Sequence, residues 1–240
     1  MSNFLTGPVQ VAAQGVHVSS ADQMHKLGEI VFANDGRAFR YTEAGATALV
    51  AGTVQQSQAQ DTDTQNLTAV AAAINDTAIA ATTTVTVTAN EYAEGFVVVS
   101  VTPGVGKTYK ISGHIAYTAA APTFNLHDYV DVALTTTSRI DAFANPYKDV
   151  VQAATTFTAP AVGVAVDATA IDQFGWLQVL GLCNVLLDGI GVIGEPVIRS
   201  NGTAGSVEPV TTTFTVQGNV GWVYTAVSST EYGGVILHLP

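Results

Sequence analysis

The sequence predicts an all-β protein of the β-barrel or β-sandwich type, and three observations carry this prediction. Thr and Val alternate over residues 83–88 and 210–216, which is the period-two pattern of half-buried strands. Turn-forming residues recur at the short spacing that is typical of barrels and sandwiches. Only residues 67–74 have a pattern compatible with a helix, and that segment is short.

The composition indicates a folded chain with little charge. Of the 240 residues, 48% are hydrophobic, which suffices for the core of one large β domain or two small ones. Only 11% are charged, against about 25% in an average soluble domain. We therefore expect the chain to pack within an assembly, or to use Thr, Ser, Asn and Gln as its polar surface.

Residues 1–28 are predicted to form an extended N-terminal arm. Gly7-Pro8 and Ser19-Ser20 interrupt any long element, and the short valine-containing pieces between them have too few apolar residues to fold alone. We expect this arm to lie on another surface and to be flexible in the free protein.

A β-hairpin is predicted directly after the arm. The apolar segments Ile30–Phe32 and Ala38–Tyr41 flank Asn34-Asp35-Gly36, and Asp-Gly tolerates the positive φ angles of a tight turn. Residues 44–54 continue with short apolar pieces of the same kind.

The middle of the chain is predicted to be a separate β-rich unit. Residues 55–63 are polar and suggest a linker, and Asn145-Pro146 suggests a turn at the other end. Residues 109–117 are predicted to be one strand with two different faces. Tyr109, Ile111, Gly113, Ile115 and Tyr117 would form its apolar face, and Lys110, Ser112, His114 and Ala116 its polar face.

Strand patterns return in the last third. One apolar face is expected from Phe174, Trp176, Leu180 and Leu182, and another from Val220, Trp222, Tyr224 and Ala226. Leu187-Asp188-Gly189 is predicted to be a turn, and Gly233–Leu239 the final strand.

These elements suggest a discontinuous domain organisation. Residues 29–56 are expected to pair with residues 150–240 in one β domain. Residues 66–145 are expected to form a smaller β-rich domain inserted into it. The polar break at residues 55–65 and the turn at residue 145 mark the two junctions.

The charge balance argues against nucleic acid and anionic membranes as partners. The net charge is −11, and the eight Lys and Arg residues are dispersed rather than gathered on one face. Residues 1–5 lack the basic and apolar regions of a signal peptide, and no apolar run approaches the ~20 residues of a membrane-spanning helix. We expect synthesis in the cytoplasm without export by the usual route.

The single cysteine predicts no intramolecular disulfide. Cys183 lies in the apolar run 180–185, which favours a buried core residue. The alternative, a nucleophile, lacks an obvious base nearby in the sequence.

Residues 103–108 end like a phosphate-binding loop. That motif needs a glycine where the chain has Val101, and it should open a helix, whereas residues 109–112 continue as a strand. We therefore predict a hairpin turn at Lys107, with no nucleotide-dependent activity.

Two groups of acidic residues have side chains of the type that binds metal ions. Asp61–Asn66 begins like a calcium loop but has Asn66 at the position that requires glycine, and Ala72 at the position of the bidentate glutamate. His127, Asp128 and Asp131 lack a third ligand at suitable spacing. Solvated side chains are the favoured interpretation in both places, and a weak surface cation is the alternative at Asp61.

The aromatic residues mostly alternate with Val and Ile and are therefore predicted to pack in the core. A carbohydrate-binding platform is the alternative, because exposed Trp and Tyr on a β surface can stack on sugars. No catalytic, cofactor-binding or metal-binding residue is predicted, and no enzymatic activity is expected.

The order of several segments resembles the structural head proteins of tailed bacteriophages, and more narrowly their capsid decoration, or cement, proteins. The resemblance lies in residues 35–41, Ala44-Gly45-Ala46, a Thr/Val-rich middle, Asn145-Pro146-Tyr147 and residues 174–181. It implies a β-rich, often trimeric, non-enzymatic virion protein. Its partners would be the major capsid protein and further copies of itself, on the outer capsid surface.

Two other functions are kept as alternatives. One is a carbohydrate-binding or receptor-binding module of a phage fibre or tail. The other is an enzyme such as a glycosidase, which would need two carboxylates about 5–10 Å apart in a cleft.

Overall fold

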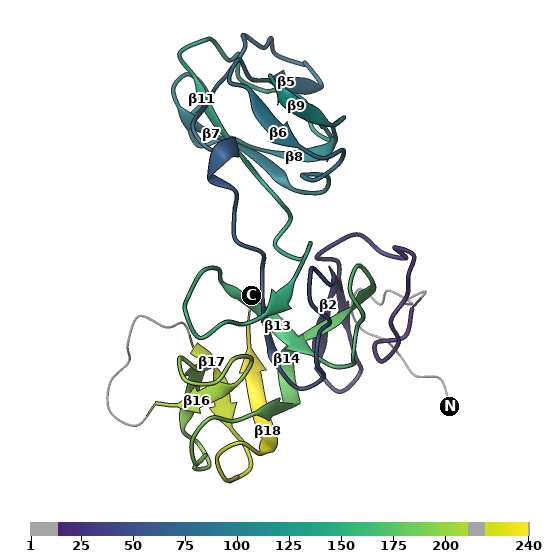
Figure 1. Ribbon diagram of the computed structural model, residues 1–240, viewed down its shortest axis with the longest axis vertical. Coiled ribbons are helices and arrows are strands. Elements are labelled where there is room, and N and C mark those ends of the chain that lie inside the picture. Colours follow the sequence, from purple (N-terminus) through teal and green to yellow (C-terminus); the bar gives the residue numbers. More distant parts are fainter. Residues whose placement is uncertain (1–13, 211–218, 240) are drawn as a thin grey trace. The chain divides into compact units, whose positions relative to one another are not determined.

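The computed structural model describes residues 14–210 and 219–239. Within them, the only helix is the short 3₁₀ helix η1 (Thr62–Thr64), and all other regular elements are strands. The prediction of an all-β fold is therefore confirmed (Figure 1). No helix in the described ranges is long and apolar enough to span a membrane.

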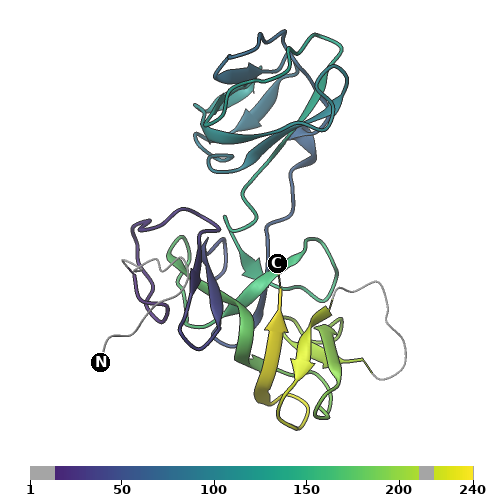
Figure 2. The ribbon, with the colours of Figure 1, turned by 180° about the vertical axis from the view of Figure 1, so that it is seen from behind.

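The chain forms two compact units. The larger comprises Met1–Ala59 and Pro146–Pro240, and the smaller comprises Gln60–Asn145. The smaller unit is thus an insertion between two segments of the larger one, and two stretches of chain join them (Figures 1 and 2).

The larger unit contains one antiparallel sheet. Its main path runs in the order β12-β3-β13-β14-β18-β17-β15-β16, and β2 pairs with both β14 and β1. The strands are β1 (Ile30–Phe32), β2 (Ala38–Glu43), β3 (Val54–Gln56), β12 (Val151–Gln152), β13 (Ala161–Ala165), β14 (Phe174–Leu186), β15 (Pro196–Arg199), β16 (Val207–Pro209), β17 (Asn219–Val223) and β18 (Tyr232–His238).

The long strand β14 organises this sheet around two cores. Its first half pairs with β2 and β13, and its second half pairs with β18. Gly181 lies where the partners change and has φ +85°, a conformation that glycine adopts without steric cost. One core contains Tyr41 and Leu177, and the other contains Val185 and Leu237. The sheet therefore curls into two half-barrels that share β14.

The predicted first hairpin is confirmed. Val31 pairs with Phe39, and the N–H of Ala33 donates to the carbonyl of Arg37. Gly36 has φ +89°, and the Asp35 carboxylate accepts the backbone N–H of Arg37. The turn residues therefore close the loop in the way that their identities predict.

Residues 14–28 pack against the larger unit and are not a separate arm. Ser20 and Phe174 exchange two backbone hydrogen bonds, and Leu27 lies in the core. The buried Gln14 amide accepts from the Tyr41 hydroxyl and donates to the carbonyl of Phe174. These contacts compensate for the low apolar content of the segment. Residues 1–13 of the predicted arm lie outside the described residues.

The smaller unit is a compact β structure with one core. A six-stranded sheet runs in the order β4-β11-β7-β8-β10-β5, and β6 pairs separately with β9. Its core includes Ile111, Phe124 and Ile140. The strands are β4 (Leu67–Thr68), β5 (Ala78–Ala80), β6 (Val85–Val87), β7 (Phe96–Val101), β8 (Thr108–Gly113), β9 (Tyr117–Ala120), β10 (Thr123–Leu126) and β11 (Arg139–Phe143).

The helix considered for residues 67–74 is wrong. β4 pairs with β11, and Ala72 forms a bridge with Leu134. The backbone hydrogen bonds of this segment are thus made with distant strands, which no local pattern reveals.

The single strand expected over residues 109–117 is also wrong. β8 ends at Gly113, after which His114 is buried and Ile115 is exposed. The His114 Nε2 atom accepts the N–H of Tyr92 at 3.0 Å, and its Nδ1 lies 2.8 Å from the Ile115 carbonyl. Two backbone partners therefore offset the cost of burying this ring, so His114 serves packing. Of the predicted Thr/Val strand at 210–216, residues 211–216 lie outside the described residues.

Candidate interaction surface

An uncharged apolar surface covers the outer side of β14, β18 and β17. Leu182 pairs with Ile236, and Ile236 pairs with Trp222, so the three side chains form a row across three strands. Tyr224 follows Trp222 by two residues. Exposed fractions of these four side chains range from 40% to 54%. We call Leu182, Trp222, Tyr224 and Ile236 the apolar face.

Strand alternation explains why these side chains point outward. Their neighbours Cys183, Val223 and Val235 belong to the core of this half-barrel. Successive residues of a strand point to opposite sides of the sheet, so residues 182, 222 and 236 must face away from that core.

The continuous apolar face expected along residues 174–182 is therefore wrong. Phe174 and Trp176 are buried, whereas Leu182 is exposed beyond the positive-φ Gly181. The face expected over residues 220–226 is wrong for a related reason. Consecutive residues of β15 pair with Asn219 and Gly221, so Val220 is an extra residue in β17. Side chains therefore do not alternate strictly along this strand, and Val220 is buried whereas Trp222 is exposed.

The apolar face is continuous and carries no formal charge. Directly opposed residues of an antiparallel pair have Cβ atoms about 4.5–5.5 Å apart. The ring centres of Trp222 and His238 lie 6.4 Å apart, and Leu182 extends over Gly234. No Asp, Glu, Lys or Arg occupies β14 beyond Gly181, β17 or β18. Exposed apolar surface of this kind is typical of contact sites.

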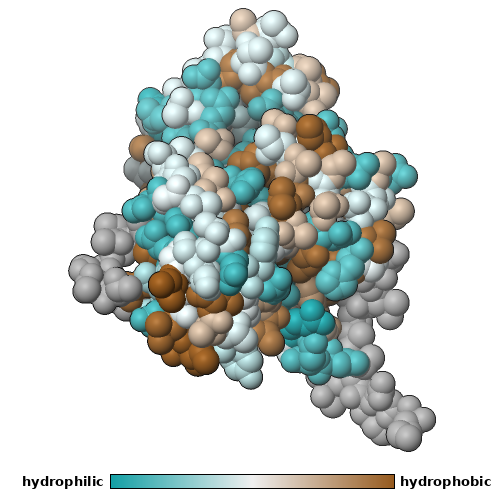
Figure 3. Space-filling view, turned by 60° about the horizontal axis from the view of Figure 1, so that its bottom comes forward, coloured by the Kyte–Doolittle hydropathy of each residue, from teal (hydrophilic) through white to brown (hydrophobic). Residues whose placement is uncertain are grey.

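A second exposed apolar group lies in the loop between β14 and β15. Ile190, Val192 and Ile193 are 54–72% exposed. The N–H groups of Gly191 and Gly194 donate to the carbonyls of Val227 and Val223, which attaches the loop to the half-barrel. Figure 3 shows brown apolar areas between teal and white ones on one face of the molecule. A run of exposed aliphatic residues is unfavourable in solution unless another surface covers it.

The region around Lys107 is a hairpin, as predicted. β7 pairs with β8, and the N–H of Gly106 donates to the carbonyl of Val99. Gly104 and Gly106 have φ +88° and +85°, and no helix follows. The loop therefore lacks the strand-to-helix geometry of a phosphate-binding loop.

The structure places Asp61 and Asp63 at the 3₁₀ helix η1. The Asp61 carboxylate accepts the backbone N–H of Asp63 at 2.8 Å and so caps the helix. Thr64 is buried and donates to the Ala142 carbonyl at 3.1 Å. Across the described residues, no group of three His, Cys, Asp or Glu side chains could hold a metal ion.

His127 and Asp128 are exposed, as expected, but Asp131 has specific partners. Its carboxylate accepts hydrogen bonds from the Lys107 ammonium and the Tyr109 hydroxyl. The hydrogen bonds from Lys107 and Tyr109 lower the pKa of Asp131 below its ordinary value of 3.8. The cluster therefore links two loops of the smaller unit.

We predict that Asp131→Asn destabilises the smaller unit fully above about pH 4 and progressively less as the pH falls below it. A lowered folded-state pKa stabilises the fold above the unfolded-state pKa, and this contribution disappears as pH falls through the folded-state value. Thermal unfolding of the wild type and the variant between pH 2 and pH 8 tests this. The exposed Asp63→Asn is the control, and a difference that persists unchanged at pH 2 contradicts the prediction.

Cys183 is buried, as predicted, and burial raises the pKa of its thiol to about 12. Because the thiolate is the reactive form, we predict that iodoacetamide at pH 8 alkylates native Cys183 at least about 10-fold more slowly than in the urea-unfolded chain. Mass spectrometry measures both rates, and equal rates would rule out this environment.

The prediction that the aromatic side chains pack in the core is confirmed for only some of them. Trp176, Tyr41 and Phe124 are buried, whereas Trp222, Tyr224 and Tyr232 are exposed. Sequence reasoning missed the apolar face because a strand with apolar residues on both sides has the same local pattern whether its second side is buried or exposed. The absence of charged residues from 219–224 and 232–238 is the one feature of the sequence that could have indicated this face.

Comparison with known proteins yields no relative. No protein family, curated protein or solved structure matches the chain. The expected relation to phage head proteins stays a prediction.

Proposed function

We propose that the chain is a non-enzymatic virion protein that binds the outer surface of a bacteriophage capsid and stabilises it. The observation that carries this proposal is the uncharged apolar face beside the exposed loop at Ile190–Ile193. Burying this surface against another protein would remove it from water, at about 25 cal/mol for each Å² of apolar area.

The proposed partners are the major capsid protein and two further copies of the chain. Closed symmetry satisfies identical interfaces, and a capsid lattice offers local three-fold positions. A trimer at these positions would also account for the low charge, since part of the surface would be covered. Its place would be the outside of the virion.

The second candidate function is a carbohydrate-binding or receptor-binding module of a fibre or tail. The exposed rings of Trp222, Tyr224 and Tyr232 favour it, because aromatic faces stack on sugar rings.

Electron microscopy of the phage that encodes the chain separates the two functions. The proposal expects three copies around each occupied local three-fold axis of the shell, at a copy number comparable to that of the capsid protein. A few copies confined to fibres or the tail would support the second function and contradict the first. One copy per axis, or pairs across two-folds, would contradict the trimer.

Ile236→Lys is expected to weaken attachment to capsids at least about 10-fold. The substitution places a charge in the centre of the apolar face, and central contact residues usually carry much of the binding energy. Co-sedimentation of the purified chain with undecorated capsids measures the effect. The matched control is Ile171→Lys, which changes an exposed isoleucine in a turn of the same unit. Equal weakening by both variants would contradict a specific role for the apolar face.

A further inference from the structure

A pocket opens beside β14 where the strand lacks a neighbour on one side. The pairing of β2 with β14 ends at Ala38 and Leu180. The next contact on this side is the hydrogen bond from the Leu186 N–H to the Gly52 carbonyl, 2.9 Å long. The gap between these points contains a pocket of about 450 Å³, within the range of about 300–1,000 Å³ of small-molecule sites.

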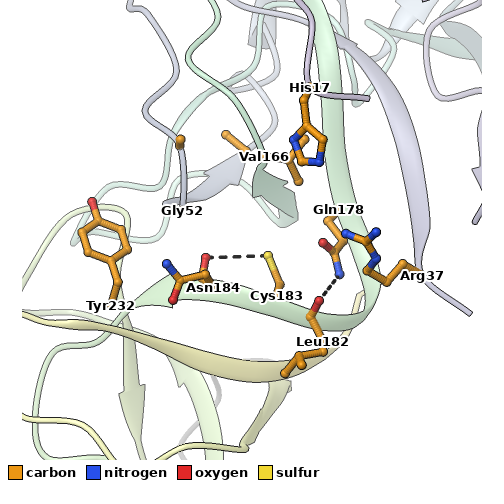
Figure 4. A pocket seen from close by; sticks show the side chains of 11 residues that line it. His17, Arg37, Gly52, Val166, Gln178, Leu182, Cys183, Asn184 and Tyr232 are labelled. Carbon is orange, nitrogen blue, oxygen red and sulfur yellow. Dashed lines mark hydrogen bonds between the residues drawn. The ribbon is translucent and has the colours of Figure 1, made fainter. Parts of the chain in front are cut away.

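Gln178 presents a hydrogen-bond acceptor to this pocket. Its Nε2 group donates to the carbonyls of Leu180 and Leu182, at 3.1 and 2.9 Å, and so replaces part of the missing strand. The residue is only 2% exposed. No hydrogen bond to its Oε1 atom occurs within the described residues, and Figure 4 shows this oxygen turned toward the pocket. An amide oxygen that opens into a pocket can accept a hydrogen bond from a ligand that supplies a donor.

The other polar side chains that line the pocket carry little net charge. Arg37 uses its Nε to pair with Asp35 at 2.8 Å, and that carboxylate offsets its charge. Asn184 and Tyr232 lie across from Arg37 and Gln178 in Figure 4, and His17 also lines the pocket. No Asp or Glu is among the lining residues, although the chain as a whole is acidic.

Apolar groups complete the walls. Val166, Ala165 and Leu182 line the pocket, and Tyr232 contributes an exposed ring. A ligand that matches this lining needs apolar C–H faces, several hydroxyl donors and acceptors, and no strong charge. Sugar rings have these properties, because they stack on aromatic rings and bond to amide and guanidinium groups.

We propose that this pocket binds a neutral saccharide of one or two rings, with Gln178 and Asn184 as hydrogen-bonding partners and Tyr232 as the stacking ring. This goes beyond the proposed attachment to a capsid, which uses the apolar face. The pocket adjoins that face, because Leu182 belongs to both. A decoration protein with this pocket would also carry a sugar-binding site on the virion surface.

Titration of the full chain tests the proposal. The probes are glucose, galactose, mannose, N-acetylglucosamine, maltose and lactose, observed by saturation-transfer NMR and calorimetry. We expect saturable millimolar or tighter binding of at least one sugar. Asn184→Ala and Tyr232→Ala are each expected to weaken it at least about 5-fold. The matched controls are Asn125→Ala and Tyr129→Ala, which change exposed residues of the smaller unit and should leave binding unchanged.

Two outcomes overturn the proposal. One is the absence of saturable binding by every sugar in the panel. The other is binding that survives both pocket variants but is lost in Trp222→Ala, which would move the site to the apolar face. Capsid attachment is measured separately, so failure of sugar binding leaves the attachment proposal open to its own test.

Discussion

Gly221→Ala is expected to disrupt the half-barrel that carries the apolar face, at a cost of about 3 kcal/mol or more. A Cβ atom at this position would lie 2.1 Å from the carbonyl oxygen of Ile236. That oxygen belongs to the backbone of β18, next to the pairing of Gly221 with Leu237, so it cannot move without breaking the sheet. Overpacking against backbone is among the most costly of single substitutions.

Chemical denaturation followed by tryptophan fluorescence measures this effect. The chain has two tryptophans, Trp176 and Trp222, and both belong to the larger unit. The control is Gly15→Ala, because a Cβ atom there would make an ordinary contact with Val18 at 3.6 Å. A variant at residue 221 that unfolds at the wild-type denaturant concentration would contradict the described pairing of β17 with β18.

Phe124→Ala is expected to lower the free energy of unfolding of the smaller unit by about 3–5 kcal/mol. The side chain is fully buried and packs edge-on against Tyr92 and His114. Truncation of such a side chain removes its transfer free energy and leaves a cavity. Hydrogen exchange followed by mass spectrometry should show the loss of protection within residues 60–145.

The larger unit should remain unaffected by Phe124→Ala. Each of the three hydrophobic core clusters consists of residues from only one unit. The fluorescence transition of Trp176 and Trp222 should therefore stay at the wild-type denaturant concentration. Phe32→Ala, at a half-exposed position of the larger unit, is the matched control for the substitution itself. A large shift of the tryptophan transition in Phe124→Ala would show that the two units unfold together.

Several features of the fold follow from local chemistry alone. The Asp35-Gly36 hairpin, the loop at Lys107 and the strand at residues 232–238 follow from turn residues and period-two alternation. These signals act over a few residues, where backbone conformation and side-chain direction are set by neighbouring groups. The all-β class follows for the same reason, because it sums many such local preferences.

The functional surfaces depend on contacts that no local pattern contains. Leu182 and Trp176 share the alternation of one strand, yet only Trp176 is buried, because β14 changes partners at Gly181. His114 has the sequence environment of a solvated side chain but becomes buried through bonds to the distant Tyr92.

The sequence alone determined that this protein is β-rich, poor in charge and without clustered catalytic groups along the chain. Only the tertiary structure decided which apolar residues stay in water and where a pocket opens. The physical reason is that a strand pattern specifies two faces but not what covers them. The strands that pack against each face are far away in sequence. Between Leu180 and Leu186, one edge of β14 has no neighbouring strand, so a pocket forms beside Gln178.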